Sequence, residues 1–237
     1  MRQGSSRPIS RIEVRESARG RELCVDGTFA SLFRPGRVTT GSVWDALAAP
    51  LLSLPPERRR SVLLLGLGGG SAARLARALL PHARIVGVER DPQVIEVARE
   101  HFHLDALMLE VVLADAQSYL ARGREKFDAV LEDVFVGSGR EVCKPDWLPD
   151  PGLVLAAQRL RAGGLLATNS LDEAAPAARA LRTHVGAAIS IEVNGYDNKI
   201  LAAGPAGLCA RGLRAAVAAH PILGATLSQL RFRTLSA

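Results

Sequence analysis

A glycine-rich turn between two apolar runs, within residues 61–91, is the feature that most limits how this chain can fold. Residues 62–65 form a continuous apolar run, which predicts a strand buried on both faces. Four glycines follow, then a helix-like segment at 71–80 and a second apolar run at 85–88 that ends on Glu89. A strand, a crossover helix and a parallel strand form one βαβ unit, so we expect an α/β fold built around a parallel sheet.

The same turn predicts a site for a nucleotide-like cofactor. Gly66, Gly68 and Gly70 would let the backbone N–H groups of the turn approach a ligand closely. Glu89 stands at the tip of the second strand, where an acid accepts both hydroxyls of a ribose. A glycine turn by itself is a weak signal, so the identity of the cofactor depends on the remaining chain.

Two further predicted strands end in carboxylates. A strand at 108–113 leads to Asp115 and Ala116, and a strand at 127–131 leads to Asp133. Ligands of parallel sheets bind outside the carboxyl ends of the strands. We therefore expect these side chains to share one site with the glycine turn and Glu89, with Asp115 and Ala116 beside an adenine. Read singly, Asp115 could be a helix cap.

A predicted hairpin separates two kinds of α/β fold. Apolar runs at 187–193 and 199–203 are joined by a short polar turn, which requires antiparallel pairing. A parallel sheet that ends in such a hairpin differs from a nicotinamide dehydrogenase, and Ser71 in place of a third glycine also disfavours that class. The pattern matches the Rossmann-like seven-stranded sheet of S-adenosylmethionine-dependent methyltransferases. We therefore expect S-adenosylmethionine or decarboxylated S-adenosylmethionine as co-substrate, with no metal.

The N-terminal part has a different pattern. After a loose polar leader at 1–9, alternating residues at 10–34 predict a small antiparallel β-meander, with a tight turn at Asp26 and Gly27. A short helix follows the meander. We expect an N-terminal unit of meander and helix at 1–56 and a methyltransferase-like catalytic domain at 57–237.

Charge and composition narrow the function classes. Residues 1–60 hold eleven arginines and six acids, and thus most of the net charge of +6. This basic N-terminal lobe is the only feature that suggests binding to RNA. Because no nucleic-acid motif accompanies the charge, a solvated surface is the favoured interpretation. No apolar stretch is long enough to cross a membrane and no secretory signal is visible. The three cysteines are widely spaced, which favours reduced thiols in a cytoplasmic protein.

The order of the motifs resembles the spermidine synthases, the polyamine aminopropyltransferases of the same superfamily. The similar stretches are V-D-G-T at 25–28, L-G-L-G-G-G-S at 65–71, V-E-R-D-P-Q-V-I-E-V-A-R at 88–99, A-D-A at 114–116 and F-D-A-V-L-E-D at 127–133. The resemblance covers about residues 10–205. It implies that the meander and the loop at 134–149 enclose a small amine acceptor, that Asp133 is the base or amine anchor, and that the protein forms a homodimer or homotetramer.

The chain departs from that family pattern at several positions. Gly69 stands where the family has an aspartate, Ala30 where it has a glutamine, Trp44 and Asp45 where it has a Tyr-His pair, and Val136 where it has a second aspartate. The resemblance implies that the missing groups recognise the aminopropyl donor and the diamine. The transferred group, aminopropyl or methyl, and the acceptor therefore stay open.

Asp133 is the residue on which the predicted chemistry depends. A sulfonium donor is already activated, so the enzyme mainly has to hold an amine in line with the carbon under attack. A carboxylate can bind the ammonium and take up its proton. The alternatives are that Asp133 only caps the following loop, that the chain is a non-catalytic adenosyl-binding homologue, or that it is an RNA methyltransferase. The last is disfavoured because no N/D-P-P-Y/F sequence follows the fourth strand.

Overall fold

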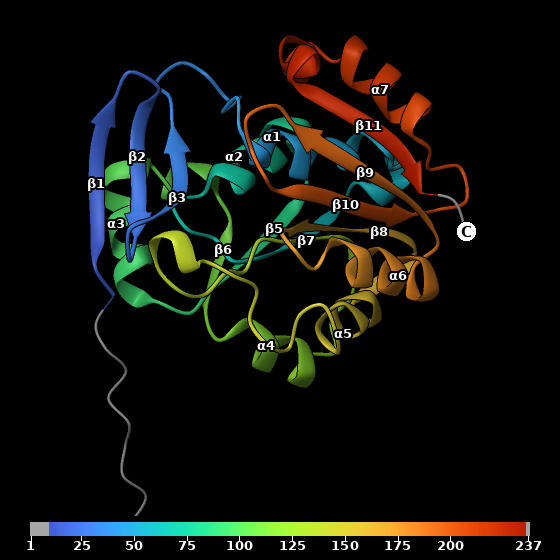
Figure 1. Cartoon of the computed structure of the whole chain (residues 1–237), viewed down its shortest axis with the longest axis horizontal. Coiled ribbons are helices and arrows are strands. Elements are labelled where there is room, and N and C mark those ends of the chain that lie inside the picture. Colours follow the sequence, from blue (N-terminus) through green and yellow to red (C-terminus); the bar gives the residue numbers. More distant parts are fainter. Residues whose placement is uncertain (1–9, 236–237) are drawn as a thin grey trace, which may run out of the picture.

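The computed structural model describes residues 10–235, apart from the side chain of Arg140, and contains two sheets (Figure 1). The predicted leader at 1–9 lies outside the described residues. The smaller sheet has three antiparallel strands in the order β1-β2-β3, and the larger has eight strands in the order β11-β9-β10-β8-β7-β4-β5-β6. The α/β class with a separate N-terminal meander is confirmed.

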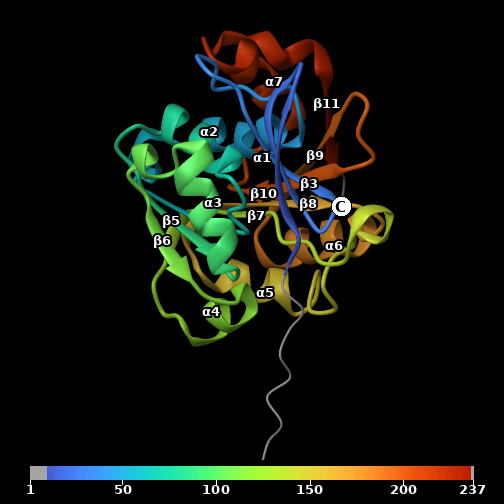
Figure 2. The same ribbon diagram turned by 90° about the vertical axis from the view of Figure 1, so that its left-hand side faces the viewer.

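The small sheet is the predicted meander. Its strands are β1 (Ile12–Ser17), β2 (Gly20–Val25) and β3 (Thr28–Phe33). Asp26 and Gly27 both have positive φ, 50° and 77°, as the tight turn between two strands requires. The sheet packs through Leu23 on Val94 and Phe102 of α3 (Pro92–Phe102), which places it over one end of the large sheet (Figure 2).

The centre of the large sheet is parallel. Strands β4 (Ser61–Leu65), β5 (Arg84–Glu89), β6 (Glu110–Leu113), β7 (Phe127–Glu132) and β8 (Leu160–Ser170) run in one direction. β9 (Ala187–Val193) and β10 (Lys199–Gly204) form the predicted antiparallel hairpin, and β10 pairs antiparallel with β8. β6 begins two residues later than predicted, because Met108 takes a left-handed conformation with φ 48°.

The large sheet has eight strands, one more than the predicted seven. β11 (Leu230–Leu235) pairs antiparallel with β9 at the edge of the sheet, after α7 (Ala210–Ala219) and the 3-10 helix η5 (Leu223–Gln229). Of its residues only Leu230 is buried, and Arg231 and Arg233 are exposed. An edge strand with so little apolar surface carries a weak sequence signal.

Helices cover both faces of the large sheet (Figure 1). One core cluster joins the sheet to α1 (Val43–Ala48), η1 (Ala49–Ser53), α2 (Ser71–Leu79) and α7, and the other joins it to α4 (Ala116–Arg122), α5 (Gly152–Gln158) and α6 (Ala174–His184). The single turns are η2 (Pro56–Arg58), η3 (Asp105–Leu107) and η4 (Gly139–Glu141). All six residues of α1 are buried, so this helix belongs to the core of the large sheet, although the division of the chain at residue 56 stays a prediction. Within residues 10–235, none of the helices combines the length and apolar character that a membrane crossing requires.

Candidate active site

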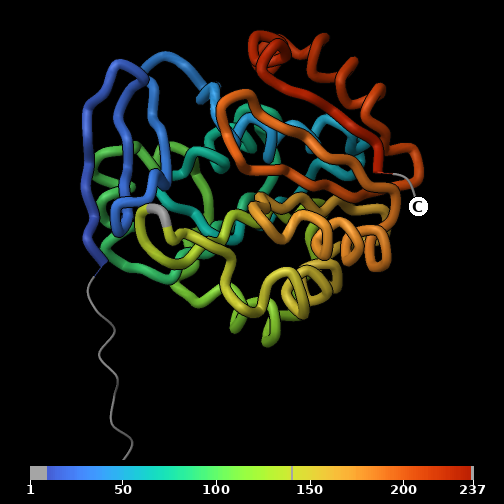
Figure 3. The backbone as a smooth tube through the Cα atoms, in the orientation of Figure 1, coloured from blue at the N-terminus to red at the C-terminus, as the bar shows by residue number. Residues whose placement is uncertain are grey.

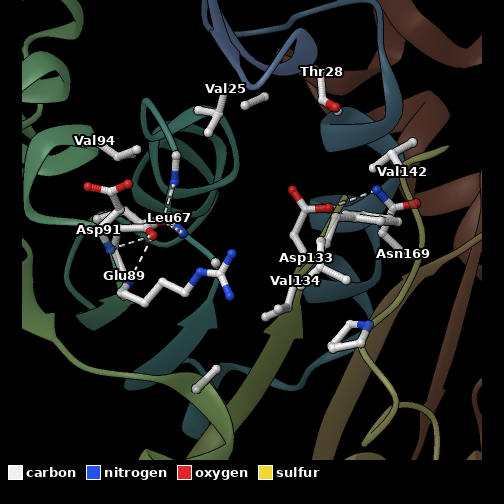
Figure 4. Close-up of a pocket in the computed structure, with 18 of the residues that line it drawn as sticks. Val25, Thr28, Leu67, Glu89, Asp91, Val94, Asp133, Val134, Val142 and Asn169 are labelled. Carbon is white, nitrogen blue, oxygen red and sulfur yellow. Dashed lines mark hydrogen bonds between the residues drawn. The ribbon is translucent and has the colours of Figure 1, made fainter. Parts of the chain in front are cut away.

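A cavity of about 400 Å³ lies at the carboxyl edge of the parallel strands, beneath the meander (Figure 4). Its wall brings together six of the seven residues that the sequence singled out: Gly66, Gly68, Glu89, Asp115, Ala116 and Asp133. Gly70 is not part of the wall. It is the N-cap of α2 with φ 84°, and a Cβ on it would approach Leu104 to 2.9 Å.

The glycine turn is a close-packed floor for this cavity. Gly66 has φ 81°, and a Cβ there would lie 2.6 Å from the carbonyl oxygen of Asp133. The backbone N–H of Gly66 continues the β4–β5 pairing by donating to the oxygen of Val88 at 3.0 Å. A side chain would therefore collide with the end of β7, and only glycine lets the turn run along this edge of the sheet.

Glu89 is held against the turn by backbone groups. Its Oε2 accepts the N–H of Leu67 at 3.2 Å and the N–H of Gly68 at 3.1 Å. Its Oε1 accepts from Arg90 and Asp91 at 2.8 and 3.2 Å. The carboxylate is thus fixed beside the glycine backbone at the end of β5 (Figure 4).

Asp115 both lines the cavity and caps a helix. Its Oδ1 accepts the N–H of Ser118 at 2.9 Å, so it is the N-cap of α4. Ala116, the first residue of that helix, is buried and also lines the cavity. The helix-cap interpretation is therefore confirmed, and the proposed place beside an adenine stays a prediction.

The carboxylate of Asp133 is held between two other elements. The indole Nε1 of Trp44, on α1, donates to Oδ2 at 2.8 Å, and Nδ2 of Asn169, near the end of β8, donates to Oδ1 at 2.7 Å. Asn198 in turn donates to Oδ1 of Asn169 at 3.0 Å, which orients that amide. Asp133 therefore faces the cavity in one orientation, opposite Glu89 (Figure 4).

Burial raises the pKa of Asp133 to about 6. The hydrogen bond from Asn169, the positive charge of Lys144 and the hydrogen bond from Trp44 act in the opposite direction, and Glu132 adds to the rise. Hydrogen bonds to the ionised form and a nearby cation stabilise the charge, but here desolvation is the larger effect. Asp133 is mostly ionised at neutral pH, with a pKa close enough to neutrality for proton transfer.

Glu132, the neighbour of Asp133, has a different role. It is fully buried, and Nζ of Lys144 lies 2.8 and 3.0 Å from its two carboxylate oxygens. Thr168 also donates to it, and Lys144 donates to the oxygen of Val134 at 2.9 Å. Lys144 therefore links the loop after β7 to the last residue of that strand, next to Asp133 in the sequence.

The same loop closes the top of the cavity. The N–H of Gly139 donates to the carbonyl oxygen of Asp26 at 3.1 Å, which joins the loop to the β2–β3 turn. In Figure 3 the loop runs from β7 toward the meander. The predicted enclosure by meander and loop is thus visible in the backbone, although what it encloses stays a proposal.

The positions that depart from the family pattern divide into two groups. Ala30, Trp44 and Val136 line the cavity. Gly69 instead donates its N–H to Oγ of Ser31 at 2.7 Å, and a Cβ there would collide with Ser31 and Phe102. Asp45 is buried and accepts from Thr40 and Gly41, which is a structural role. Only the first group can affect a ligand directly.

Sequence reasoning missed two partners of Asp133. Asn169 lies near the end of β8, so the rule that sites form at the carboxyl ends of strands could have found it. Trp44 stands out in the sequence only as a departure from the family pattern, and nothing in the sequence pairs it with a residue 89 positions away. The sequence around Lys144 does not indicate a role for it either, because the ion pair with Glu132 forms only in the folded chain.

The lining of the cavity is acidic. Among the side chains that the structure describes, five carboxylates line it against one arginine, namely Asp26, Glu89, Asp91, Asp115 and Asp133 against Arg90. Such a lining favours a cationic ligand. Within the described residues, no group of three or more His, Cys, Asp or Glu side chains is arranged to hold a metal ion.

Comparison with known proteins places this site in a known fold. Residues 62–141 match the model of a methyltransferase domain. A probable polyamine aminopropyl transferase of Bifidobacterium longum is 35% identical over 97 residues, which are 40% of this chain and 21% of that protein. An eEF1A lysine and N-terminal methyltransferase homolog of Drosophila pseudoobscura pseudoobscura is 39% identical over 97 residues, which are 39% of this chain and 14% of that protein. The match thus spans about a fifth or less of each of these relatives.

A solved structure resembles nearly the whole chain. The crystal structure of a probable spermidine synthase from Corynebacterium glutamicum superposes with a TM-score of 0.71 and covers 95% of this chain and 88% of that one. The sequence identity is 17%, so the likeness concerns the fold. The predicted fold and the resemblance to the spermidine synthases are confirmed.

Proposed function

We propose that this chain, which is similar to S-adenosylmethionine-dependent methyltransferases and polyamine aminopropyltransferases, transfers an aminopropyl or methyl group to a small amine acceptor. The donor is S-adenosylmethionine or its decarboxylated form. The observation that carries the proposal is the position of Asp133: an oriented carboxylate in the same cavity as the glycine turn and Glu89, on the opposite side.

The donor is assigned to the side of the cavity that holds the glycine turn. Gly66 and Gly68 line the cavity and have no side chain that could stand between their backbone and a ligand. Glu89 receives the ribose hydroxyls, and Asp115 and Ala116 flank the adenine. The acidic lining also favours the positive sulfonium over the negative diphosphate of a dinucleotide.

The acceptor amine is assigned to Asp133. Attack by the amine nitrogen on the carbon attached to sulfur forms the new C–N bond, breaks the C–S bond and leaves a neutral thioether. The proton that the nitrogen gives up goes to Asp133. Because an alkylammonium has a pKa near ~10, a carboxylate with a pKa of about 6 makes this transfer about 3 kcal/mol less unfavourable than one of ordinary pKa 3.8.

A ligand panel tests the donor. Thermal unfolding is measured with S-adenosylmethionine, decarboxylated S-adenosylmethionine, methylthioadenosine and NAD. A ligand that binds the native state raises the melting temperature by mass action, so we expect a rise with the adenosyl sulfur compounds and none with NAD. No response to any adenosyl compound would contradict the proposal.

Turnover distinguishes the remaining alternatives. A protein that binds the adenosyl compounds but alkylates no amine fits the non-catalytic homologue. Methylation of RNA, and not of small amines, would identify the protein as an RNA methyltransferase. The contact between Gly139 and Asp26 over the cavity favours the small acceptor.

A further inference from the structure

Aromatic side chains are concentrated around the cavity. The chain has ten aromatic residues in all, six Phe, two Tyr and two Trp. Five of them line this one cavity: Phe29, Trp44, Phe135, Trp147 and Tyr196. Phe29 and Trp44 pack edge to face with centroids 5.2 Å apart, and Trp44 contacts Asp133 directly. Aromatic rings thus form much of the cavity wall, and one of them contacts Asp133, although the chain as a whole is poor in aromatic residues.

The other carboxylates of the cavity lie away from Asp133 or are engaged elsewhere. Glu89 and Asp91 lie on the opposite side, where the donor is assigned (Figure 4). Asp115 caps α4. Asp26 sits in the β2–β3 turn, where its Oδ1 accepts the N–H of Arg11 at 2.7 Å. Among the described lining residues, Asp133 is the carboxylate that Trp44 and Asn169 hold on the side of the cavity opposite Glu89.

The loop after β7 adds apolar side chains to the cavity wall. Val136 and Val142 both line the cavity, and Figure 4 shows Val142 beside Asn169. Lys144, which lies in the same loop, has its charge balanced by the buried carboxylate of Glu132. A second ammonium in the part of the cavity next to Asp133, here called the acceptor half, would lie among apolar groups.

We infer that the acceptor is a monoamine on an uncharged apolar body, and not a diamine or polyamine. The ammonium binds Asp133 with the rings of Trp44 and its neighbours around it, since aromatic faces attract cations. The apolar body fills the space bounded by aromatic residues and valines. A second charged amine would lose its hydration without gaining a carboxylate, which is strongly unfavourable. This inference rests on the proposed function, because it assigns Asp133 to the acceptor.

A matched series of amines tests the inference. Calorimetric titration of the full chain, with and without saturating methylthioadenosine, compares n-hexylamine and benzylamine with 1,4-diaminobutane and 1,6-diaminohexane. Hexylamine and 1,6-diaminohexane differ only in the second amine. We expect the monoamines to bind at least ten-fold more tightly than the diamines. Equal or tighter binding of a diamine, or no binding of any monoamine under either condition, would overturn the inference.

Two further arms separate the inference from other outcomes. Nα-acetyl-lysine N-methylamide, a probe for a protein lysine, should bind more weakly than hexylamine; binding of this probe alone would overturn the inference in favour of a protein acceptor. Failure of methylthioadenosine to bind counts against the proposed donor. Binding of methylthioadenosine together with preference for a diamine counts against the inference alone.

A gain-of-function variant provides the second test. The backbone of Val136 pairs with Cys143 through two hydrogen bonds of 2.9 Å, which a change of side chain leaves in place. Val136→Asp adds a second carboxylate to the acceptor half, the part of the cavity next to Asp133. Val136→Asn is the uncharged control. We expect Val136→Asp to tighten binding of 1,6-diaminohexane at least ten-fold and Val136→Asn to leave it unchanged. If both variants unfold like the wild type and neither changes diamine affinity, the acceptor half is not where the inference places it.

Discussion

The indole N–H of Trp44 donates to the carboxylate of Asp133 at 2.8 Å, across 89 residues of sequence. This bond joins α1 to the end of β7, and together with the bond from Asn169 it sets the direction in which the carboxylate faces. It also lowers the pKa of Asp133 against the larger effect of burial. The orientation and the acidity of the proposed base thus depend on one aromatic side chain from the N-terminal part of the chain.

Replacing Trp44 by Phe should move the pH dependence of activity. The proposed base works when ionised, so in the wild type kcat/KM falls as the pH drops through the pKa of Asp133, about 6. Losing the indole hydrogen bond removes a group that favours the ionised form, so the pKa rises and the acid limb moves to higher pH. The measurement is a pH–rate profile of kcat/KM. Trp147→Phe, in the same cavity wall, is the control and should leave the limb in place; an unmoved limb in Trp44→Phe contradicts the assignment.

Asp133→Asn should separate catalysis from donor binding. The variant keeps the shape of the side chain and removes its capacity to take a proton, so we expect turnover to fall by about 10²–10⁴-fold. The affinity for methylthioadenosine should stay within about two-fold, because the donor is assigned to the opposite side. Asp26→Asn keeps a residue that tolerates the positive φ of the turn and should retain turnover. Equal activity in Asp133→Asn would exclude it as the base.

Glu89→Gln should weaken binding of the donor and leave binding of the acceptor unchanged. Glutamine has one acceptor oxygen where the carboxylate has two, so it cannot serve both the backbone N–H groups and two ribose hydroxyls. We expect the Kd for methylthioadenosine to rise by about ten-fold or more, in line with loss of a charged hydrogen bond of roughly 1.5–3 kcal/mol. Calorimetry measures it, with Glu96→Gln on the exposed face of α3 as the control. An unchanged Kd would place the ribose elsewhere.

Lys144→Met should destabilise the protein. It leaves the fully buried carboxylate of Glu132 without its cation, a change that typically lowers the free energy of unfolding by about 3–5 kcal/mol. Urea unfolding at pH 7 measures the loss. The double variant Lys144→Met with Glu132→Gln removes both charges and should recover part of the stability. If the double variant loses as much as the sum of the single variants, the two residues do not act as a pair.

Patterns that depend on neighbouring residues were predictable. The βαβ unit at 61–91 follows from short apolar runs and glycines. The turn at Asp26 and Gly27 and the hairpin at 187–204 follow from turn chemistry. β11 was missed because its alternating arginines are exposed at an edge, where little burial is needed.

The sequence by itself determined that an α/β fold would carry a glycine turn and strand-end carboxylates on one side of its sheet, because periodicity and turn residues act locally and parallel strands end at a common edge. Only the tertiary structure decided what those groups do there. It placed Gly70 in a helix cap and Gly69 against the meander, and it gave Asp133 its partners Trp44 and Asn169. These contacts depend on how α1 packs on the sheet, and the pKa of Asp133 depends on how far its carboxylate is removed from water. The spacing of a motif contains neither kind of information.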